Sequence, residues 1–191
     1  MKLNDNVDTT NPWVTLKTSV VLETPWFKFR KDDVKTPKGQ NGTYSFIEKK
    51  GGAGAVILNE KNEIFLVGQY RYTMDEYTWE IIAGGIEENE DPLETVKREI
   101  KEEAGIIANS YELLIKDLHI SNCITSERGV IYLVRDIKEI GLQNLDPTEK
   151  IAVKKIPFKE AVSLVYQGEI KDAFSIVGIL LANQALNKEK K

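Results

Sequence analysis

Hydrophobic and polar positions follow two different periods along this chain, and the period changes from one segment to the next. Segments in which apolar residues alternate with polar ones, or run together over a few positions, predict β-strands. Segments in which apolar residues recur every three or four positions predict amphipathic helices. These patterns predict strands at 14–22, 26–35, 44–47, 55–58, 64–70, 111–120, 129–135 and 151–156, and helices at 92–105, 158–167 and 171–187.

The first predicted helix has a start signal, an apolar stripe and a stop signal. Asp91 is suited to cap the N-terminus, and Pro92 is suited to the first helical position, where a missing N–H is not needed. Gly105 stands where a left-handed residue commonly ends a helix. The apolar stripe between these ends consists of Leu93, Val96, Ile100 and Ala104.

The order of the elements indicates the fold class. A polar turn around residues 60–62 predicts that strands 55–58 and 64–70 form a hairpin, and a loop then leads through Met74 to Trp79. One helix lies among the strands and two more close the chain. This order differs from a regular alternation of strand and helix, and it predicts a layered α+β protein.

Composition limits the kind of protein further. The 191 residues are 41% hydrophobic and 29% charged, which is typical of a soluble globular chain. No apolar run approaches the ~18–20 residues that span a bilayer, and the first residues lack the apolar core of a signal peptide. Cys123 is the only cysteine, which excludes an internal disulfide and favours a cytoplasmic setting. His119 is the only histidine, which disfavours a zinc site built from His and Cys.

The negative charge is concentrated in one short segment. The net charge is -4, which provides no basic surface and argues against nucleic acid as a partner. Residues 87–103 hold eight acids against three bases, so this segment carries -5 and the rest of the chain +1. Charge runs usually form a solvated helix face. The spacing of the acids within the predicted helix indicates a different role.

Three glutamates of this helix share one face. Glu99 and Glu103 are four residues apart, and Glu102 borders the same face. Like charges at this spacing repel, so a bridging cation is indicated. Carboxylates without His or Cys suit Mg²⁺ or Mn²⁺, and protein-bound Mg²⁺ often takes further ligands from substrate phosphates. The spacing therefore favours metal-assisted hydrolysis of a phosphorylated substrate.

The segment 84–106 resembles the Nudix box, whose pattern is G-x5-E-x7-R-E-U-x-E-E-x-G-U with U an aliphatic residue. All nine constrained positions match: Gly84, Glu90, Arg98, Glu99, Ile100, Glu102, Glu103, Gly105 and Ile106. Flanking segments resemble the branch of this family that hydrolyses ADP-ribose and nucleoside diphosphate sugars. The resemblance covers roughly residues 20–185, and its flanking segments are 69–72, 79–80, 83–87, 146–151 and 168–175.

The resemblance implies a role for each matching residue. The metal ligands, for Mg²⁺ or Mn²⁺, would be the carboxylates of Glu99, Glu102 and Glu103 and the backbone carbonyl of Ala83. Arg71 and Glu80 would contact substrate. Arg98, also a candidate substrate contact, would hold the loops around the helix together with Glu90. Activation of the attacking water would fall to Glu149 in the late loop or to Glu127, with Glu102 as a further catalytic candidate.

The resemblance also implies an architecture. The expected fold is an α/β/α sandwich with a mixed sheet in residues 49–191, preceded by an antiparallel β subdomain in residues 1–48. That subdomain would support a homodimer, with its strands swapped between protomers. The expected partner is a small nucleotide sugar, with no nucleic acid and no membrane.

Two departures from the branch bear on the substrate. Residues 82–84 read Ile-Ala-Gly where Pro-Ala-Gly is common, and residues 118–127 lack a proline that ADP-ribose enzymes often carry. The second departure favours other nucleoside diphosphate sugars, such as GDP-mannose or ADP-glucose, beside ADP-ribose. Two alternatives stay open: a Nudix-fold sensor that binds a nucleotide sugar without cleaving it, and a house-cleaning or mRNA-cap hydrolase. The segments 69–71 and 79–80 argue against the latter.

Overall fold

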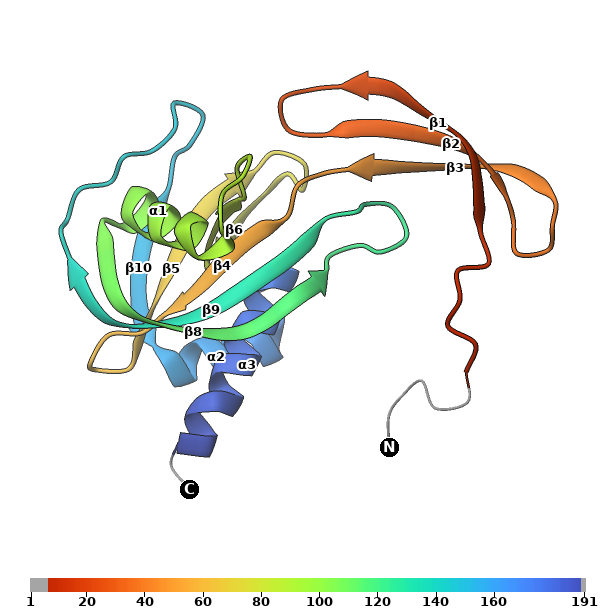
Figure 1. Ribbon diagram of the computed structural model, residues 1–191. Coiled ribbons are helices and arrows are strands. Elements are labelled where there is room, and N and C mark those ends of the chain that lie inside the picture. Colours follow the sequence, from red (N-terminus) through yellow and green to blue (C-terminus); the bar gives the residue numbers. More distant parts are fainter. Residues whose placement is uncertain (1–6, 190–191) are drawn as a thin grey trace. The chain divides into compact units, whose positions relative to one another are not determined.

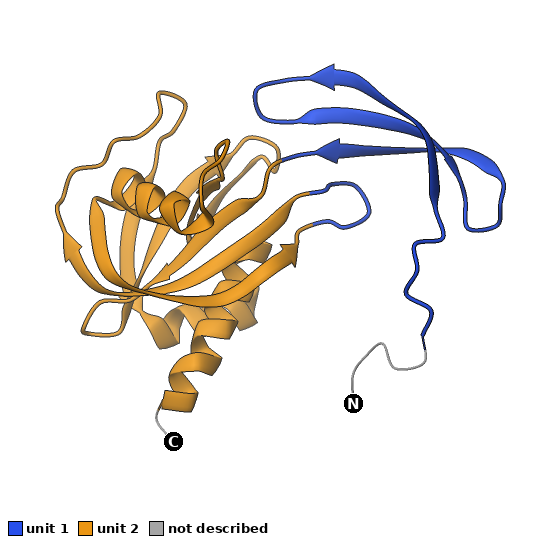
Figure 2. Cartoon of the chain, in the orientation of Figure 1, with its two compact units in different colours: residues 1–49, 121–126 blue, residues 50–120, 127–191 orange. Residues whose placement is uncertain are grey.

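The computed structural model describes residues 7–189 and divides the chain into two compact units. The first unit contains the residues up to 49 together with 121–126, and the second contains 50–120 and the residues from 127 onward (Figure 2). The first unit therefore takes in a short loop from the middle of the chain, which no local sequence pattern predicts.

The first unit is built on a three-stranded antiparallel sheet with the order β1-β2-β3. Its strands are β1 (Val14–Glu23), β2 (Lys28–Lys35) and β3 (Asn41–Glu48), as the alternation predicted to within a few residues. The loop 121–126 joins this unit because Ile47 at the end of β3 forms a parallel bridge with Thr125. The expected antiparallel β structure at the N-terminal end is confirmed.

The second unit contains two sheets and three helices. One sheet has the order β10-β5-β6 and the other β7-β4-β9-β8, in which β4 and β9 run parallel and the other neighbours antiparallel. None of the described helices is long and apolar enough to cross a membrane. The elements are β4 (Gly52–Ile57), β5 (Glu63–Arg71), β6 (Glu76–Glu80), β7 (Ile82–Gly85), α1 (Pro92–Ala104), β8 (Ile106–His119), β9 (Arg128–Glu139), β10 (Ala152–Pro157), α2 (Phe158–Gln167) and α3 (Ala173–Glu189).

The helices lie on two sides of the sheets and each side has its own core (Figure 1). On one side α1 packs Val96 and Ile100 into a cluster with residues of β4, β5 and β9. On the other side α2 and α3 contribute Phe158, Ala161 and Ile179 to a second cluster with the same strands. Alternate side chains of these strands enter the two clusters, so the strands are apolar on both faces. The expected α/β/α sandwich with a mixed sheet is confirmed.

Helix α1 begins and ends where its sequence signals predicted. The Asp91 carboxylate accepts a hydrogen bond from the Leu93 N–H at 2.8 Å, and Pro92 occupies the first turn. At the other end Gly105 has φ of 61° and its N–H donates to the carbonyl oxygen of Lys101 at 3.0 Å. A residue with a side chain would be strained in this conformation, so Gly105 turns the chain directly from α1 into β8.

The predicted hairpin of strands 55–58 and 64–70 is wrong. Strands β4 and β5 lie in different sheets and meet only at one bridge, between Leu58 and Ile64. Strand β4 is central and pairs with β7 and β9, which come much later in the chain. The strands β6 and β7 were not predicted, because they are short and separated only by Ile81, where the chain passes from one sheet to the other.

Helix α3 approaches the sheet closely because glycines face its first turns. A Cβ atom added to Gly54 would lie 2.9 Å from the ring of Phe174, and one added to Gly129 would lie 2.3 Å from it. Gly178, on the helix itself, leaves room for Ile81, whose Cδ1 would lie 3.1 Å from an added Cβ. These contacts fix the start of α3 against the ends of β4 and β9 and against the crossing point at Ile81.

Candidate active site

Glu103 is the most deeply buried acid of α1. It is 4% exposed, and its Oε2 atom has no hydrogen-bond partner. Burial, together with the negative charges of Glu99 and Glu149, raises the pKa of Glu103 to about 8. A buried carboxylate without a partner is costly, so the position is suited to an acid that a cation neutralises.

Glu99 and Glu102 lie beside Glu103 and share one counter-charge. The Nη1 atom of Arg98 lies 2.6 Å from Glu99 Oε1 and 3.3 Å from Glu102 Oε2. Burial raises the pKa of Glu99 despite the attraction of Arg98, whereas the Glu102 side chain is more exposed. Arg98 therefore joins Glu99 and Glu102, and the charge of Glu99 also acts on the buried Glu103.

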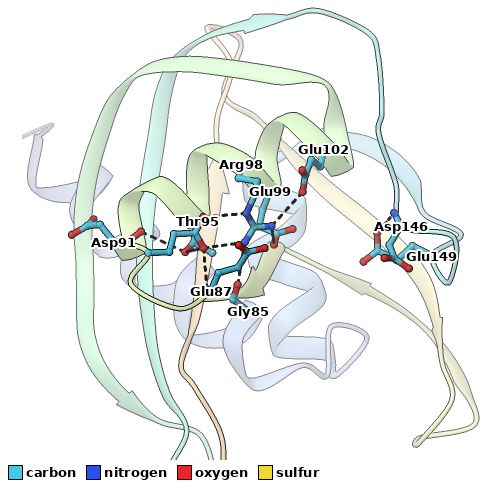
Figure 3. A network of polar contacts seen from close by, with 10 residues as sticks. Gly85, Glu87, Asp91, Thr95, Arg98, Glu99, Glu102, Asp146 and Glu149 are labelled. Atoms are coloured by element: carbon cyan, nitrogen blue, oxygen red, sulfur yellow. Dashed lines mark hydrogen bonds and ion pairs between the residues drawn. The ribbon is translucent and has the colours of Figure 1, made fainter. Parts of the chain in front are cut away.

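Arg98 also connects α1 to the loop that precedes it (Figure 3). Its Nε and Nη2 atoms donate to the two carboxylate oxygens of Glu90 at 3.1 and 3.2 Å, and Nη2 also donates to the Gly85 carbonyl at 3.1 Å. Glu90 additionally accepts from the Glu87 N–H and from the Thr95 hydroxyl. These hydrogen bonds, that from Arg98 first, lower the pKa of Glu90 to about 2. Glu90 is thus a fixed structural anion.

Strand β7 brings the backbone of Ala83 and Gly84 against α1. A Cβ atom on Gly84 would lie 1.8 Å from Oε1 of Glu99, so only glycine lets that carboxylate occupy its place. Ala83 pairs with Gly54 of β4, which holds the strand in register. The predicted backbone ligand and the predicted carboxylate ligands therefore come from adjoining segments of the same unit.

Arg71 and Glu80 pair with each other across strands β5 and β6. The Nε atom of Arg71 donates to Glu80 Oε1 at 2.9 Å and its Nη2 atom donates to Oε2, while the Thr78 hydroxyl donates to Oε1 at 2.5 Å. Burial acts to raise the pKa of Glu80, but the bonds from Arg71 and Thr78 outweigh it, and the pKa is lowered. Glu80 is buried, whereas 43% of the Arg71 side chain is exposed. The guanidinium is thus held in place and is still accessible.

The two candidate bases lie on different loops. The loop before β10 is tied to α1 because the Asn144 N–H donates to the Glu102 carbonyl at 2.9 Å. Glu149 on this loop is exposed, and its charge contributes to raising the pKa of both Glu99 and Glu103. Glu127 directly precedes β9. Its Oε1 atom lies 3.9 Å from the point where a Cβ atom added to Gly52 would stand. Figure 3 shows Glu149 beside Asp146, whose N–H donates to the Glu149 carboxylate.

The residues present fit a magnesium or manganese ion. Within residues 7–189 no three acidic, histidine or cysteine side chains converge closely enough to complete a metal site by themselves. Mg²⁺ does not require such a cage, because it usually keeps waters and takes one or two carboxylates together with substrate phosphate. The unpartnered oxygen of Glu103, the adjacent Glu99 and the backbone at Ala83 supply hard oxygen donors.

Sequence reasoning missed two hydroxyl residues that complete the site. Thr95 is fully buried and donates to Glu90 at 2.8 Å, and Thr78 donates to Glu80. Thr78 lies in a short strand that was not predicted. Thr95 follows Asp91 by four residues and lies beside the apolar stripe. A polar side chain in that place is expected to be buried and to need a hydrogen-bond partner, and this signal could have identified it.

Comparisons with known proteins agree with this geometry. Residues 48–174 match the model of the NUDIX domain, and residues 13–47 match that of the nucleoside diphosphate sugar hydrolase N-terminal domain. The chain is 31% identical over 156 residues to an ADP-ribose pyrophosphatase of Mycobacterium tuberculosis, covering 81% of this chain and 75% of the relative. It is 27% identical over 166 residues to a methanol dehydrogenase activator of Bacillus methanolicus, covering 86% and 89%. A solved structure of an ADP compounds hydrolase shares the fold, with a TM-score of 0.80, 20% identity and coverage of 93% and 95%.

Proposed function

Because this chain belongs to the Nudix family, we propose that it is a Mg²⁺-dependent pyrophosphatase that hydrolyses a nucleoside diphosphate sugar to a nucleoside monophosphate and a sugar phosphate. The observation that carries the proposal is the buried carboxylate of Glu103, which has no hydrogen-bond partner and lies one helical turn from Glu99. Relatives named ADP-ribose pyrophosphatase support the type of reaction.

The residues that would hold the ion are Glu99, Glu102, Glu103 and the Ala83 carbonyl. A bound Mg²⁺ ion would neutralise negative charge on the diphosphate and would lower the pKa of a coordinated water molecule. The buried side of α1 excludes water from Glu103, which strengthens its electrostatic interactions. Arg98, whose pKa is raised chiefly by its hydrogen bond to Glu90, stays cationic and limits repulsion between Glu99 and Glu102.

Arg71 is suited to bind a phosphate of the substrate. Its pair with Glu80 and its neighbouring acids, Asp172 and Glu103, raise its pKa, so it is cationic at all relevant pH values. An arginine fork binds phosphate oxygens in two parallel hydrogen bonds, and Glu80 holds one edge of this fork in position. Glu80 therefore acts on the substrate through Arg71 in this arrangement.

Glu149 is the proposed base, and Glu127 is the second candidate. We expect Glu149→Gln to lower kcat by roughly a hundredfold, with little change in KM, because proton transfer from water would lose its acceptor. Glu127→Gln is the matched comparison and is expected to change kcat less. Steady-state rates over pH 6–9 would decide between them. A larger kcat loss in Glu127→Gln than in Glu149→Gln would assign the base to Glu127.

A substrate panel tests the proposed reaction. The protein and Mg²⁺ are mixed with ADP-ribose, GDP-mannose, ADP-glucose, diadenosine polyphosphates or nucleoside triphosphates, and phosphate is measured after a phosphatase is added. We expect release from at least one nucleoside diphosphate sugar and none when EDTA replaces Mg²⁺. Release from none of the panel, with binding of a nucleotide sugar by calorimetry, would identify a sensor. Release from triphosphates alone would identify a house-cleaning enzyme.

The first unit is proposed to form a homodimer interface. Strand β1 exposes five large apolar side chains, and exposed apolar surface commonly marks an association site. They are Val14, Leu16, Val20, Val21 and Leu22. Light scattering should give twice the chain mass of 21.6 kDa, and a mass of one chain at micromolar concentration would exclude the dimer.

A further inference from the structure

The chain changes sheets at Ile81, and this crossing leaves one backbone donor without a strand partner. Strand β6 ends at Glu80 in the sheet β10-β5-β6, and β7 begins at Ile82 in the sheet β7-β4-β9-β8. Ile81 is 2% exposed, so water does not satisfy its N–H. The hydroxyl oxygen of Ser175 accepts this N–H at 2.9 Å, across 94 residues of sequence.

Ser175 is itself held by the start of α3. It is fully buried, its hydroxyl donates to Asp172 Oδ2 at 2.7 Å, and its backbone N–H donates to the same oxygen at 2.7 Å. Because the hydroxyl hydrogen is used by Asp172, the lone pairs of Ser175 are directed toward Ile81. Asp172 thus acts as a helix cap and orients the hydroxyl at the same time.

The crossing point stands between two parts of the candidate site. Directly before it, Glu80 binds Arg71, and Asp172 lies close enough to Arg71 to contribute to raising its pKa. Two residues after it comes Ala83, whose carbonyl is a proposed metal ligand. A shift of the chain at Ile81 would therefore displace the phosphate-binding arginine and the metal-binding backbone together.

We propose that Ser175, oriented by Asp172, is a positioning residue for the hydrolysis. Its hydroxyl fixes the chain at Ile81 and thereby sets the position of the Ala83 carbonyl relative to the α1 carboxylates, as well as that of the Glu80–Arg71 pair. This inference rests on the proposed function of Ala83 and Arg71.

Ser175→Ala tests the proposal, with Ile179→Val as the matched control. Ile179 lies on the same helix and is also fully buried, but its side chain makes no polar contact, so its variant measures the effect of destabilising α3 alone. We expect Ser175→Ala to lower kcat/KM roughly tenfold or more and to weaken Mg²⁺ binding severalfold in calorimetry with the metal alone. Ile179→Val should lower the melting temperature and change neither kcat/KM nor Mg²⁺ affinity.

Two further variants keep the test decisive. Ser175→Cys keeps the size of the side chain but replaces the hydroxyl by a weak acceptor, so it should show the same defect as alanine even if Ser175→Ala does not fold. Ser175→Thr keeps the hydroxyl and should restore Mg²⁺ affinity. Unchanged Mg²⁺ affinity and kcat/KM in Ser175→Cys would overturn the inference. A wild-type protein that is inactive on the whole panel would instead refute the proposed function.

Discussion

Glu103→Gln is expected to make the enzyme inactive and the metal-free protein more stable. The kcat value should fall roughly a thousandfold, because Glu103, the most buried of the proposed metal ligands, loses the negative charge that would bind the ion. Stability should rise at pH 8, because glutamine is neutral and has no ionised form whose burial is costly. A loss of activity caused by unfolding would show the opposite change in stability.

The direction of the pH effect follows from the raised pKa. An ordinary glutamate has a pKa of 4.5, and that of Glu103 in the folded protein is about 8. Below pH 4.5 the carboxyl is protonated in both states and burial costs little. Between pH 4.5 and 8 the unfolded state ionises first, so the free energy of unfolding falls as pH rises. Glu103→Gln should remove this fall, with a difference of about 2–4 kcal/mol at pH 8.

Chemical denaturation in EDTA at pH 5 and pH 8 measures this difference. Glu88→Gln is the matched control, because the Glu88 side chain is 84% exposed and should change neither activity nor stability by much. Added Mg²⁺ should stabilise the wild-type protein at pH 8 and leave Glu103→Gln nearly unaffected. Equal stability of wild type and Glu103→Gln at pH 8, or turnover near that of the wild type, would contradict the assignment of Glu103 as a buried metal ligand.

The sequence predicted local features of this protein better than long-range ones. Helix α1, from the cap at Asp91 to Gly105, was predicted because every signal lies within a few residues. The acidic face of α1 follows from the same helical period, so the candidate metal ligands could be proposed from the sequence alone. The pairing of β4 with β9 was not predicted, because the paired residues, such as Gly52 and Gly129, are 77 positions apart and no local pattern indicates which strand will be the partner.

Residues that act through others were the hardest to predict. Ser175 follows Asp172 by three residues, a spacing that indicates a helix start, but the bond from the Ile81 N–H depends on where two sheets meet. Arg71 was predicted as a substrate contact, and its pairing with Glu80 depends on β6, which was not predicted. Tertiary placement, rather than residue type, decides these contacts.

Gly84→Ala is expected to abolish most activity without unfolding the protein. The added Cβ would lie 1.8 Å from Glu99 Oε1, so the carboxylate must move away from β7. The displaced atoms, Cγ to Oε1 of Glu99, all belong to one flexible side chain and to no backbone segment, so we expect the protein to stay folded. Loss of the Glu99 position should lower kcat roughly a hundredfold or more and weaken Mg²⁺ binding.

Gly85→Ala is the matched control at the next residue. No atom lies within 4 Å of a Cβ added there, so activity and melting temperature should stay close to those of the wild type. If Gly84→Ala and Gly85→Ala reduced activity equally, backbone freedom in this turn would be the cause and the Glu99 contact would not. A selective loss in Gly84→Ala, together with weakened Mg²⁺ binding in calorimetry, would instead show that position 84 must lack a side chain for the Glu99 carboxylate to reach the metal.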